Sequence, residues 1–405
     1  MKKDYFFNTL AGIINASEAI IISIIITRTA SLTDAGYITI AFAIGNLLLS
    51  IGKYGIYGFQ VTEHSNKYTF ADFLNVRIIT TLTMVLSLIL YDIYGTYVFS
   101  YNREKSLIVL LIGLIYSIES FEDLIKAQLH YLGCLYLGAL FFILRWLSIL
   151  ISFGMSMYCI GNVTTSLAIS FIVSLFVFSF CCFYVRKTIY IKADYNRKHI
   201  VGLLSSCFPI FLSTFLSFYT INSSKYAIDR CMDAKVQACY GFVAMPIFAI
   251  DLLSCFIYQP QLRNLTLDYL NNEIKHFRLK MVKQYSVILF FTITGYIFAY
   301  FLGIPILSLL YHTNLNNYLY ELLVLILSGG FLALTGYQSM ILTIMRKQIY
   351  QLIGYIPISI LAFLFVSPIV KKYGTVGAAF SCLLLFIFLF IIYEIFICKE
   401  LKGKK

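Results

Sequence analysis

Apolar stretches long enough to cross a membrane recur along the whole chain, and they constrain its fold more than any other feature. We count twelve of them in the 405 residues. As a helix, a run of about 20 apolar residues crosses the roughly 30 Å of hydrocarbon in a bilayer. Sixty per cent of the residues are hydrophobic and 12 per cent are charged, whereas a soluble domain carries about 25 per cent charged residues. The sequence therefore predicts an all-α polytopic membrane protein.

The connections between these stretches are short, so no soluble domain is expected. All backbone groups of a helix are hydrogen-bonded within the segment, which is what hydrocarbon requires. The expected transmembrane helices are residues 7–28, 35–62, 74–98, 106–129, 132–159, 164–185, 201–221, 236–262, 284–310, 318–345, 349–370 and 374–398.

Lysine and arginine predict the orientation, because cytoplasmic connections carry an excess of both. With the N-terminus inside, inner segments hold 20 of the 31 lysines and arginines, and outer segments hold eight. Arg77 lies at an inner helix end, and Lys53 and Arg145 lie within spans. Both termini are therefore expected in the cytoplasm. The net charge of +12 follows from this bias, so we do not expect nucleic acid as a partner.

The chain divides into two halves with equal numbers of spans. We expect an N-terminal six-helix bundle at 1–186, a basic cytoplasmic linker at 187–200 and a C-terminal six-helix bundle at 201–405. A short pattern supports duplication: Ala-x-Tyr-x-x-x-Ala begins at Ala35 and again at Ala238. Repeats of equal orientation are related by an axis along the membrane normal, and the cleft between them is the expected substrate site.

The second span carries a polar stripe that includes a lysine. Residues three, four or seven apart share one face of a helix. A lysine in a segment otherwise suited to hydrocarbon is costly, and it is therefore a functional-site hypothesis. Lys53 falls in the inner half of this span, so we expect it to form one wall of an inner vestibule. The stripe comprises Thr39, Asn46, Ser50, Lys53, Tyr57 and Gln60.

Three more charged residues fall near the middle of spans: Glu18 in the first, Arg145 in the fifth and Asp251 in the eighth. Intramembrane charges either pair with one another and hold the bundle together, or line a water-filled cavity. The sequence leaves both interpretations open. In a cavity, Arg145 is the candidate for the central contact to an anion, and Glu18 and Asp251 are candidates for ion coupling.

An acidic cluster near the inner end of the fourth span is interpreted as an interfacial anchor. Glu122 and Lys126 lie four residues apart and can pair on one helix face, with Glu119 and Asp123 beside them. Arg28, at the outer end of the first span, is placed either to meet an anionic group or to reach lipid headgroups.

Sequence patterns for catalysis are absent. The five histidines lie in or beside connections without metal-ligand neighbours at useful spacing, and no Walker A sequence or Ser-His-Asp constellation is found. We therefore expect a carrier that is not an enzyme and that holds no cofactor or metal.

Several short motifs, in this order on twelve spans, resemble those of bacterial O-antigen flippases of the Wzx type. These belong to the polysaccharide transporter family of the multidrug/oligosaccharidyl-lipid/polysaccharide (MOP) exporter superfamily. The resemblance extends over nearly the whole length. It rests on Asp34-Ala35-Gly36-Tyr37, the segment YGIYGFQVTE with the following Tyr68, Lys225-Tyr226-Ala227-Ile228-Asp229-Arg230, the run from Met245-Pro246 to Pro260, and Tyr373-Gly374 to Gly377-Ala378-Ala379.

The resemblance implies two six-helix bundles around a central cavity that opens alternately to each side. Such proteins move an undecaprenyl-pyrophosphate-linked oligosaccharide from the cytoplasmic to the periplasmic leaflet of the bacterial inner membrane, beside other O-antigen assembly proteins. Lys53, Arg145, Arg28 and Lys225 would supply positive charge for the pyrophosphate. The polyprenyl tail would stay in membrane lipid. The alternatives are a multidrug or cation antiporter with the fold of the multidrug and toxic compound extrusion (MATE) transporters and, less favoured, a membrane enzyme such as an O-antigen polymerase.

Overall fold

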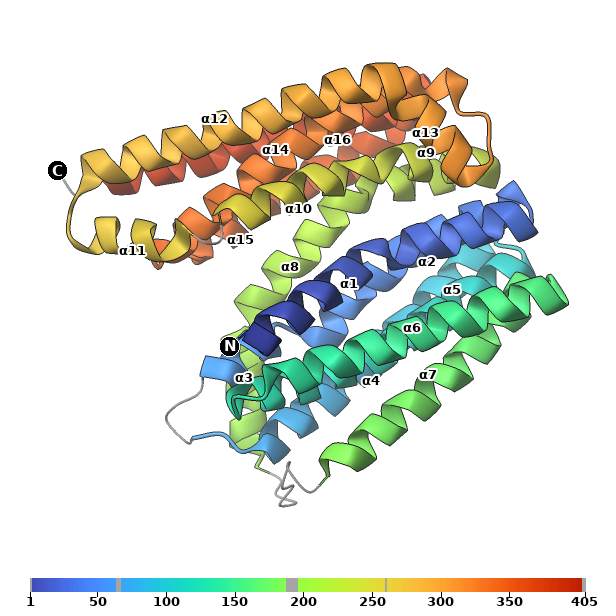
Figure 1. Ribbon diagram of the computed structural model, residues 1–405, viewed down its shortest axis with the longest axis horizontal. Helices are drawn as coiled ribbons and strands as arrows, with labels where there is room; N and C mark the ends of the chain where they lie inside the picture. Colours follow the sequence, from blue (N-terminus) through green and yellow to red (C-terminus); the bar gives the residue numbers. More distant parts are fainter. Residues whose placement is uncertain (1, 63–66, 187–195, 259–260, 403–405) are drawn as a thin grey trace. The chain divides into compact units, whose positions relative to one another are not determined.

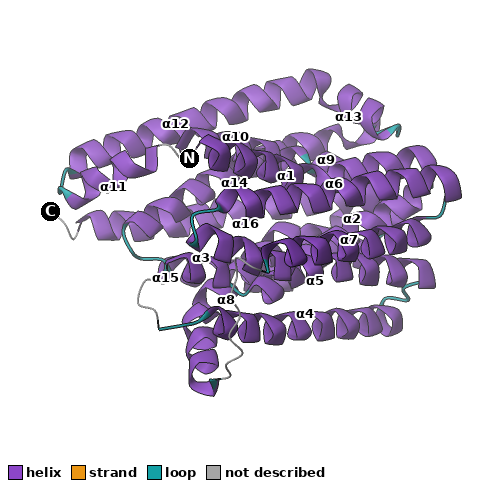
Figure 2. Ribbon diagram, turned by 60° about the horizontal axis from the view of Figure 1, so that its bottom comes forward, coloured by secondary structure: helices purple, strands orange, loops and turns teal. Residues whose placement is uncertain are grey.

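The computed structural model describes residues 2–62, 67–186, 196–258 and 261–402. Within these ranges the chain is almost entirely helical and contains no strand (Figures 1 and 2). Contacts divide it into two compact units, Met1–Phe218 and Tyr219–Lys405. The division falls inside one long helix. Most of the linker expected at 187–200 lies outside the described residues. We describe each unit by itself.

The first unit consists of seven helices and the beginning of an eighth. Side-chain caps fix several of the helix starts: Ser31 and Asp34 form a capping box, as do Thr69 and Asp72. The helices are α1 (Lys2–Thr29), α2 (Leu32–Lys53), α3 (Ile56–Thr62), α4 (Phe70–Val98), α5 (Arg103–Tyr131), α6 (Leu135–Ile160), α7 (Val163–Val185) and the first part of α8 (Arg197–Cys231).

The second unit continues from α8 and is built around α14, which packs against α10, α12 and α16. Gly329 of α14 allows one close approach, since a Cβ there would lie 2.8 Å from the carbonyl oxygen of Ile247. The elements are α9 (Ala234–Ala244), α10 (Pro246–Tyr258), α11 (Leu262–Leu270), α12 (Ile274–Phe298), the π-helix η2 (Ala299–Gly303), α13 (Ile304–Tyr311), the 3-10 helix η3 (Asn316–Tyr318), α14 (Leu319–Ile344), α15 (Ile349–Leu361), the π-helix η4 (Ala362–Val366) and α16 (Ser367–Lys402).

The predicted fold class is confirmed. Ten helices in the described ranges are long and apolar enough to cross a membrane. The difference from the twelve expected spans has two sources. The fourth expected span, α5, carries several acidic and basic residues, and the last two lie within one continuous stretch, Ile349–Lys402. Gly374 marks the junction in that stretch, with φ 64° and ψ −144°.

The expected second span is not one continuous helix, and this prediction is corrected. α2 ends at Lys53, and the chain turns through Tyr54 and Gly55, whose φ values are 48° and 68°, before α3 begins at Ile56. The amide of Tyr54 still bonds to the carbonyl of Ser50. The predicted stripe is therefore divided between two helices. Its lysine stands at a helix C-terminus, where the helix dipole favours a positive charge.

The first half of α8 belongs to the first unit and packs against its other helices. Ile200, Leu203 and Cys207 join a buried cluster with Ile56 and Phe73. Beside it, the ring of Tyr54 stacks on Phe211 at a centroid distance of 4.5 Å, and Nδ1 of His199 lies 3.0 Å from a carboxylate oxygen of Asp72. These contacts explain why the contact-based boundary lies after Phe218.

In the second unit, several prolines lie where one helix ends and another begins or where the helix geometry changes. Pro246 begins α10 directly after α9, and Pro305 lies in the first turn of α13, just after the π-helix η2. Pro357 lies inside α15, which runs into η4. Because proline cannot donate a backbone hydrogen bond, helices change geometry at such points.

Candidate functional site

A polar cavity of about 310 Å³ lies within the first unit, between residues of α1, α2, α5 and α6. Two asparagines of α1, Asn8 and Asn15, line it together with Ala11, Gly12 and Phe142. The charged residues of its wall are Lys53, Glu119, Glu122, Asp123 and Lys126. A cavity with this lining inside a helix bundle of membrane-spanning length is the natural candidate site.

Lys53 reaches this cavity from the end of α2. Its Nζ lies 2.8 Å from Oε1 of Glu119 on α5. The lysine side chain is 35% exposed and the glutamate side chain 3%, so the ammonium lies at the open edge of the pair and the carboxylate lies inside. The sequence predicted the position of Lys53 at a vestibule wall, and the structure places it in the cavity wall beside a carboxylate.

Arg145 lies deeper and is fully buried. Its Nε donates to Oε2 of Glu122 at 2.7 Å, and a terminal nitrogen donates to Oε2 of Glu119 at 3.2 Å. Its other terminal nitrogen is 3.4 Å from Oγ of Ser174. Trp146 also donates to Oε2 of Glu119, at 3.2 Å. Every nitrogen of the guanidinium group therefore has a partner inside the bundle, and Arg145 acts there as a counter-ion for two carboxylates.

A second buried cation, Arg77, supports the same region. Arg77 of α4 pairs with Asp123 at 2.8 Å and donates to the carbonyl oxygen of Gly52 at 2.7 Å. Thr80 donates to the same carbonyl, which lies in the last turn of α2. The described cavity wall itself holds two lysines and three carboxylates. Arg77 and Arg145 lie behind it and pair with those carboxylates.

Glu18 belongs to a second, connected group. The hydroxyl of Tyr116 donates to its Oε1 at 2.6 Å, and Nδ2 of Asn46 lies 3.3 Å from that hydroxyl. Glu18 is buried, and its Oε2 has no hydrogen-bond partner among the described residues. Tyr116 therefore links two residues that the sequence singled out on different helices. A buried carboxyl group with one free oxygen is suited to take up a proton or a cation.

Tyr57 and Gln60, at the inner end of the predicted stripe, lie on α3 and face α5. The hydroxyl of Tyr57 is 2.9 Å from Nδ1 of His130, and Nε2 of Gln60 donates to Oε1 of Gln128 at 2.9 Å. Neither residue lines the cavity described above.

The remaining predicted residues are one residue of the first unit and two of the second. Arg28 is exposed in the last turn of α1. Lys225 belongs to the second unit, where its Nζ lies 5.9 Å from the ring centroid of Phe248 beside Tyr240 and Cys382. Asp251 lies on α10, but its side chain is outside the described residues. Within the first unit, the structure thus joins Lys53 with Arg145 through Glu119, and Glu18 with Asn46 through Tyr116.

Sequence reasoning missed the residues that hold this network together. The acidic cluster was interpreted as an interfacial anchor, yet Glu119 and Glu122 are buried and pair with Lys53 and Arg145. The signal available was their spacing: residues three apart on one helix present two carboxylates to the same neighbour. A separate polar group in the second unit was also not predicted: Glu394 accepts a hydrogen bond from the hydroxyl of Tyr285 at 2.8 Å.

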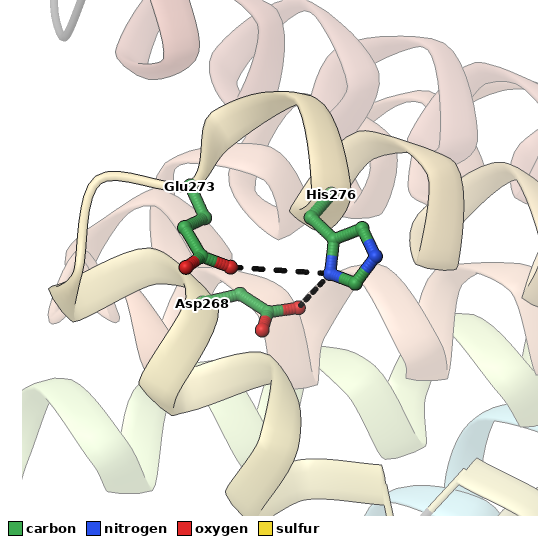
Figure 3. A group of neighbouring side chains, drawn as sticks. All are labelled: Asp268, Glu273 and His276. Atoms are coloured by element: carbon green, nitrogen blue, oxygen red, sulfur yellow. Dashed lines mark ion pairs between the residues drawn. The ribbon is translucent and has the colours of Figure 1, made fainter.

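A different cluster lies at the junction of α11 and α12 (Figure 3). The ligand atoms of Asp268, Glu273 and His276 lie within 4.8 Å of one another, a proximity that sequence spacing did not predict. The ammonium of Lys280 lies 2.6 Å from Oδ2 of Asp268. Because a cationic side chain already pairs with the one buried carboxylate, this cluster does not make a convincing metal site.

No protein-family model and no curated protein matches the sequence. Solved structures do match. An inward-facing multidrug resistance MATE transporter of the MOP superfamily has a TM-score of 0.72 at 12% identity over 97% of this chain and 96% of its own. The lipid II flippase MurJ, in an inward closed conformation, has a TM-score of 0.72 at 15% identity over 96% and 87%. A MOP superfamily transporter from Pyrococcus furiosus has a TM-score of 0.58 at 11% identity over 99% and 95%. The chain therefore has the fold of MOP superfamily transporters.

Proposed function

We propose that this protein is a flippase of the Wzx type, which moves an undecaprenyl-pyrophosphate-linked O-antigen oligosaccharide from the cytoplasmic to the periplasmic leaflet of the bacterial inner membrane. The bundles 1–186 and 201–405 would alternate in access around the substrate, with both termini in the cytoplasm. The observation that carries the proposal is the pair of lysines, Lys53 and Lys126, in the wall of a polar cavity inside a membrane-spanning bundle. The likeness in fold to a lipid II flippase supports it.

Lys53 is the residue best suited to meet the pyrophosphate. It is the more exposed partner of its ion pair, so it can exchange one anion for another without a buried charge being left alone. An incoming pyrophosphate would compete with Glu119 for its ammonium group. Arg145 is already bound to Glu119 and Glu122, so its role would be to hold these carboxylates in place and to meet substrate only after they move.

The other candidates take secondary roles in this proposal. Lys225 in the second unit would contribute positive charge later on the path, and Arg28 would meet the head group at the outer side. Asn46, Tyr57 and Gln60 offer hydroxyl and amide groups for sugars. Movement of an anion outward is favoured by a negative-inside potential, by about 2.3 kcal/mol per charge at 100 mV. Proton or cation uptake by Glu18 or Asp251 would provide additional coupling.

The proposal is tested by removing the gene and returning variants. A flippase defect strands lipid-linked repeat units on the cytoplasmic side and abolishes surface O-antigen, whereas a polymerase defect leaves single units on the surface. Lys53→Ala is expected to lose surface display and Lys53→Arg to retain most of it, provided both insert normally. Single repeat units on the surface of the deletion strain would contradict the flippase assignment, and normal display from Lys53→Ala would contradict the role of the lysine.

A second candidate function is export of a cationic compound, as in a MATE-like antiporter. The observation that favours it is the presence of three carboxylates, Glu119, Glu122 and Asp123, in the wall of the same cavity. Cations would be attracted to these groups if Lys53 swung away. This function predicts that cells expressing the protein resist cationic dyes and that Glu119→Gln, where it is inserted at the level of the unmodified chain, removes the resistance. Unchanged dye sensitivity, with O-antigen display restored by the same expression, would exclude it.

A further inference from the structure

The second unit contains a groove of about 440 Å³ that is distinct from every polar site described above. Its walls come from α10, α12, η2, α13 and α14. Twelve of its thirteen described lining residues are apolar, and the remaining one is Thr294. The hydroxyl of Thr294 donates to the carbonyl oxygen of Phe290 at 2.8 Å, so its hydrogen is already used. The described wall therefore offers no charge to a ligand.

The groove has a buried floor and an exposed rim. Leu322 and Ile326 of α14 form part of the floor and are 1% and 4% exposed. Leu253 and Phe298, on the rim, are 50% and 54% exposed. These walls belong to helices of membrane-spanning length. A rim of exposed large apolar side chains at membrane depth faces hydrocarbon, and an apolar hollow of this kind excludes water.

Two backbone features create the hollow. Gly295 of α12 has no side chain, which leaves space on this side of the helix. A Cβ added there would point toward Ile250 and Ile326, at 3.7 and 3.9 Å. One turn later, the helix widens into the π-helix Ala299–Gly303, a geometry that is often found at functional sites. Gly303 lies so close to Leu322 that a Cβ there would be 2.7 Å from it. The helix thus stays close to α14 while leaving space beside it.

We propose that this groove binds the polyprenyl tail of the lipid substrate while the head group crosses the membrane. This proposal rests on the proposed flippase function. A long, uncharged hydrocarbon chain is the occupant that matches the described wall, which carries no charge. The substrate carries such a chain, which must stay in an apolar medium throughout transport. A tail seated in this groove would hold the substrate against one bundle, instead of leaving the tail free in bulk lipid.

The experiment is photocrosslinking of the full chain in nanodiscs of phosphatidylethanolamine and phosphatidylglycerol that contain radiolabelled undecaprenyl phosphate. A photoreactive phenylalanine analogue replaces Phe298 at the rim or, as the matched control, Phe290, which lies on α12 outside the groove and is 65% exposed. We expect the polyprenyl label at position 298 in excess over position 290. Equal labelling at the two positions would show ordinary lipid contact only and would overturn the proposal.

Variants of Gly295 distinguish labelling that depends on the groove from labelling by the surrounding lipid. Gly295→Leu fills the groove and is expected to abolish the excess at position 298. Gly295→Ala adds a Cβ at ordinary contact distance and is expected to retain it. Excess labelling that survives Gly295→Leu would overturn the groove as the site. If labelling is absent in a chain that still supports O-antigen display, the tail site alone fails. If display does not depend on the chain at all, the proposed function fails independently of the labelling result.

Discussion

Lys53 and Arg145 share one carboxylate, that of Glu119. Lys53 pairs with Oε1 at 2.8 Å, and Arg145 pairs with Oε2 at 3.2 Å. The two cations that the sequence places within spans are thus coupled through a third residue. Since Lys53 is partly exposed and Arg145 is not, a ligand that draws Lys53 away changes the balance of charge around the buried arginine. Glu119 thus links the edge of the cavity to α6.

Glu119→Gln is expected to destabilise the protein more than Lys53→Ala does. The glutamine leaves Lys53 without its counter-ion and Arg145 with only Glu122, and removing one partner of a buried ion pair costs about 3–5 kcal/mol. Lys53→Ala leaves Glu119 paired with Arg145 and Trp146. Melting temperatures of the purified variants in detergent measure the difference, and equal melting temperatures would contradict this ranking.

Arg145→Lys is expected to lower stability although the charge is kept. A lysine cannot reach Glu122, Glu119 and Ser174 with the fixed fork of a guanidinium group, and each buried group left without a partner costs about 1–3 kcal/mol. The control is Arg103→Lys at the exposed start of α5, which should melt as the unmodified chain does. A normal melting temperature for Arg145→Lys would mean that the guanidinium geometry is not needed.

Features that depend on one segment of the chain could be predicted from the sequence, whereas contacts between residues distant in the sequence could not. Hydropathy predicted the helices, because burying about 20 apolar residues in lipid is a property of each segment alone. It also predicted that Lys53 and Arg145 lie within them. The partners could not be predicted, since Glu119 lies 66 residues from Lys53 and 26 from Arg145, and helical periodicity indicates which face a residue occupies but not which helix meets that face.

The interruption between α2 and α3 shows a second limit of sequence-based prediction, namely where a helix is broken. The region is rich in glycine, and Gly55 adopts a φ of 68° that favours glycine. A Cβ at Gly55 would also lie 2.7 Å from Ile210 of α8, so the turn is held by packing against a segment distant in the chain. The hydrophobic pattern continues through the break, which is why it suggested a single helix.

Filling the cavity should block transport without loss of stability. Gly12 lines the cavity, and a Cβ at this position would meet no atom within 4 Å. Gly12→Phe is therefore expected to insert and melt normally. Under the proposed flippase function it should reduce O-antigen display strongly, because the ring would occupy space beside Lys53. Gly58→Phe is the matched control: Gly58 is exposed on α3, a Cβ there is equally unhindered, and it does not line the cavity. Equal display from both variants would contradict a role for the cavity.

Gly45→Ala is expected to disturb Glu18 from a distance. A Cβ at Gly45 would lie 2.5 Å from the ring of Tyr116, whose hydroxyl donates to Glu18 at 2.6 Å. The ring must move, and overpacking of this kind costs about 1–3 kcal/mol. Gly154→Ala provides the comparison, since its Cβ would meet Ile25 at an ordinary 3.7 Å; removing a glycine from a helix interior there should stabilise by about 0.5–1 kcal/mol. The melting temperature should therefore fall for the first variant and stay level or rise for the second.

If Gly45→Ala melts normally while display is lost, the displaced tyrosine acts through Glu18 and not through stability. If both stability and display are unchanged, the contact between Tyr116 and Glu18 has no part in transport.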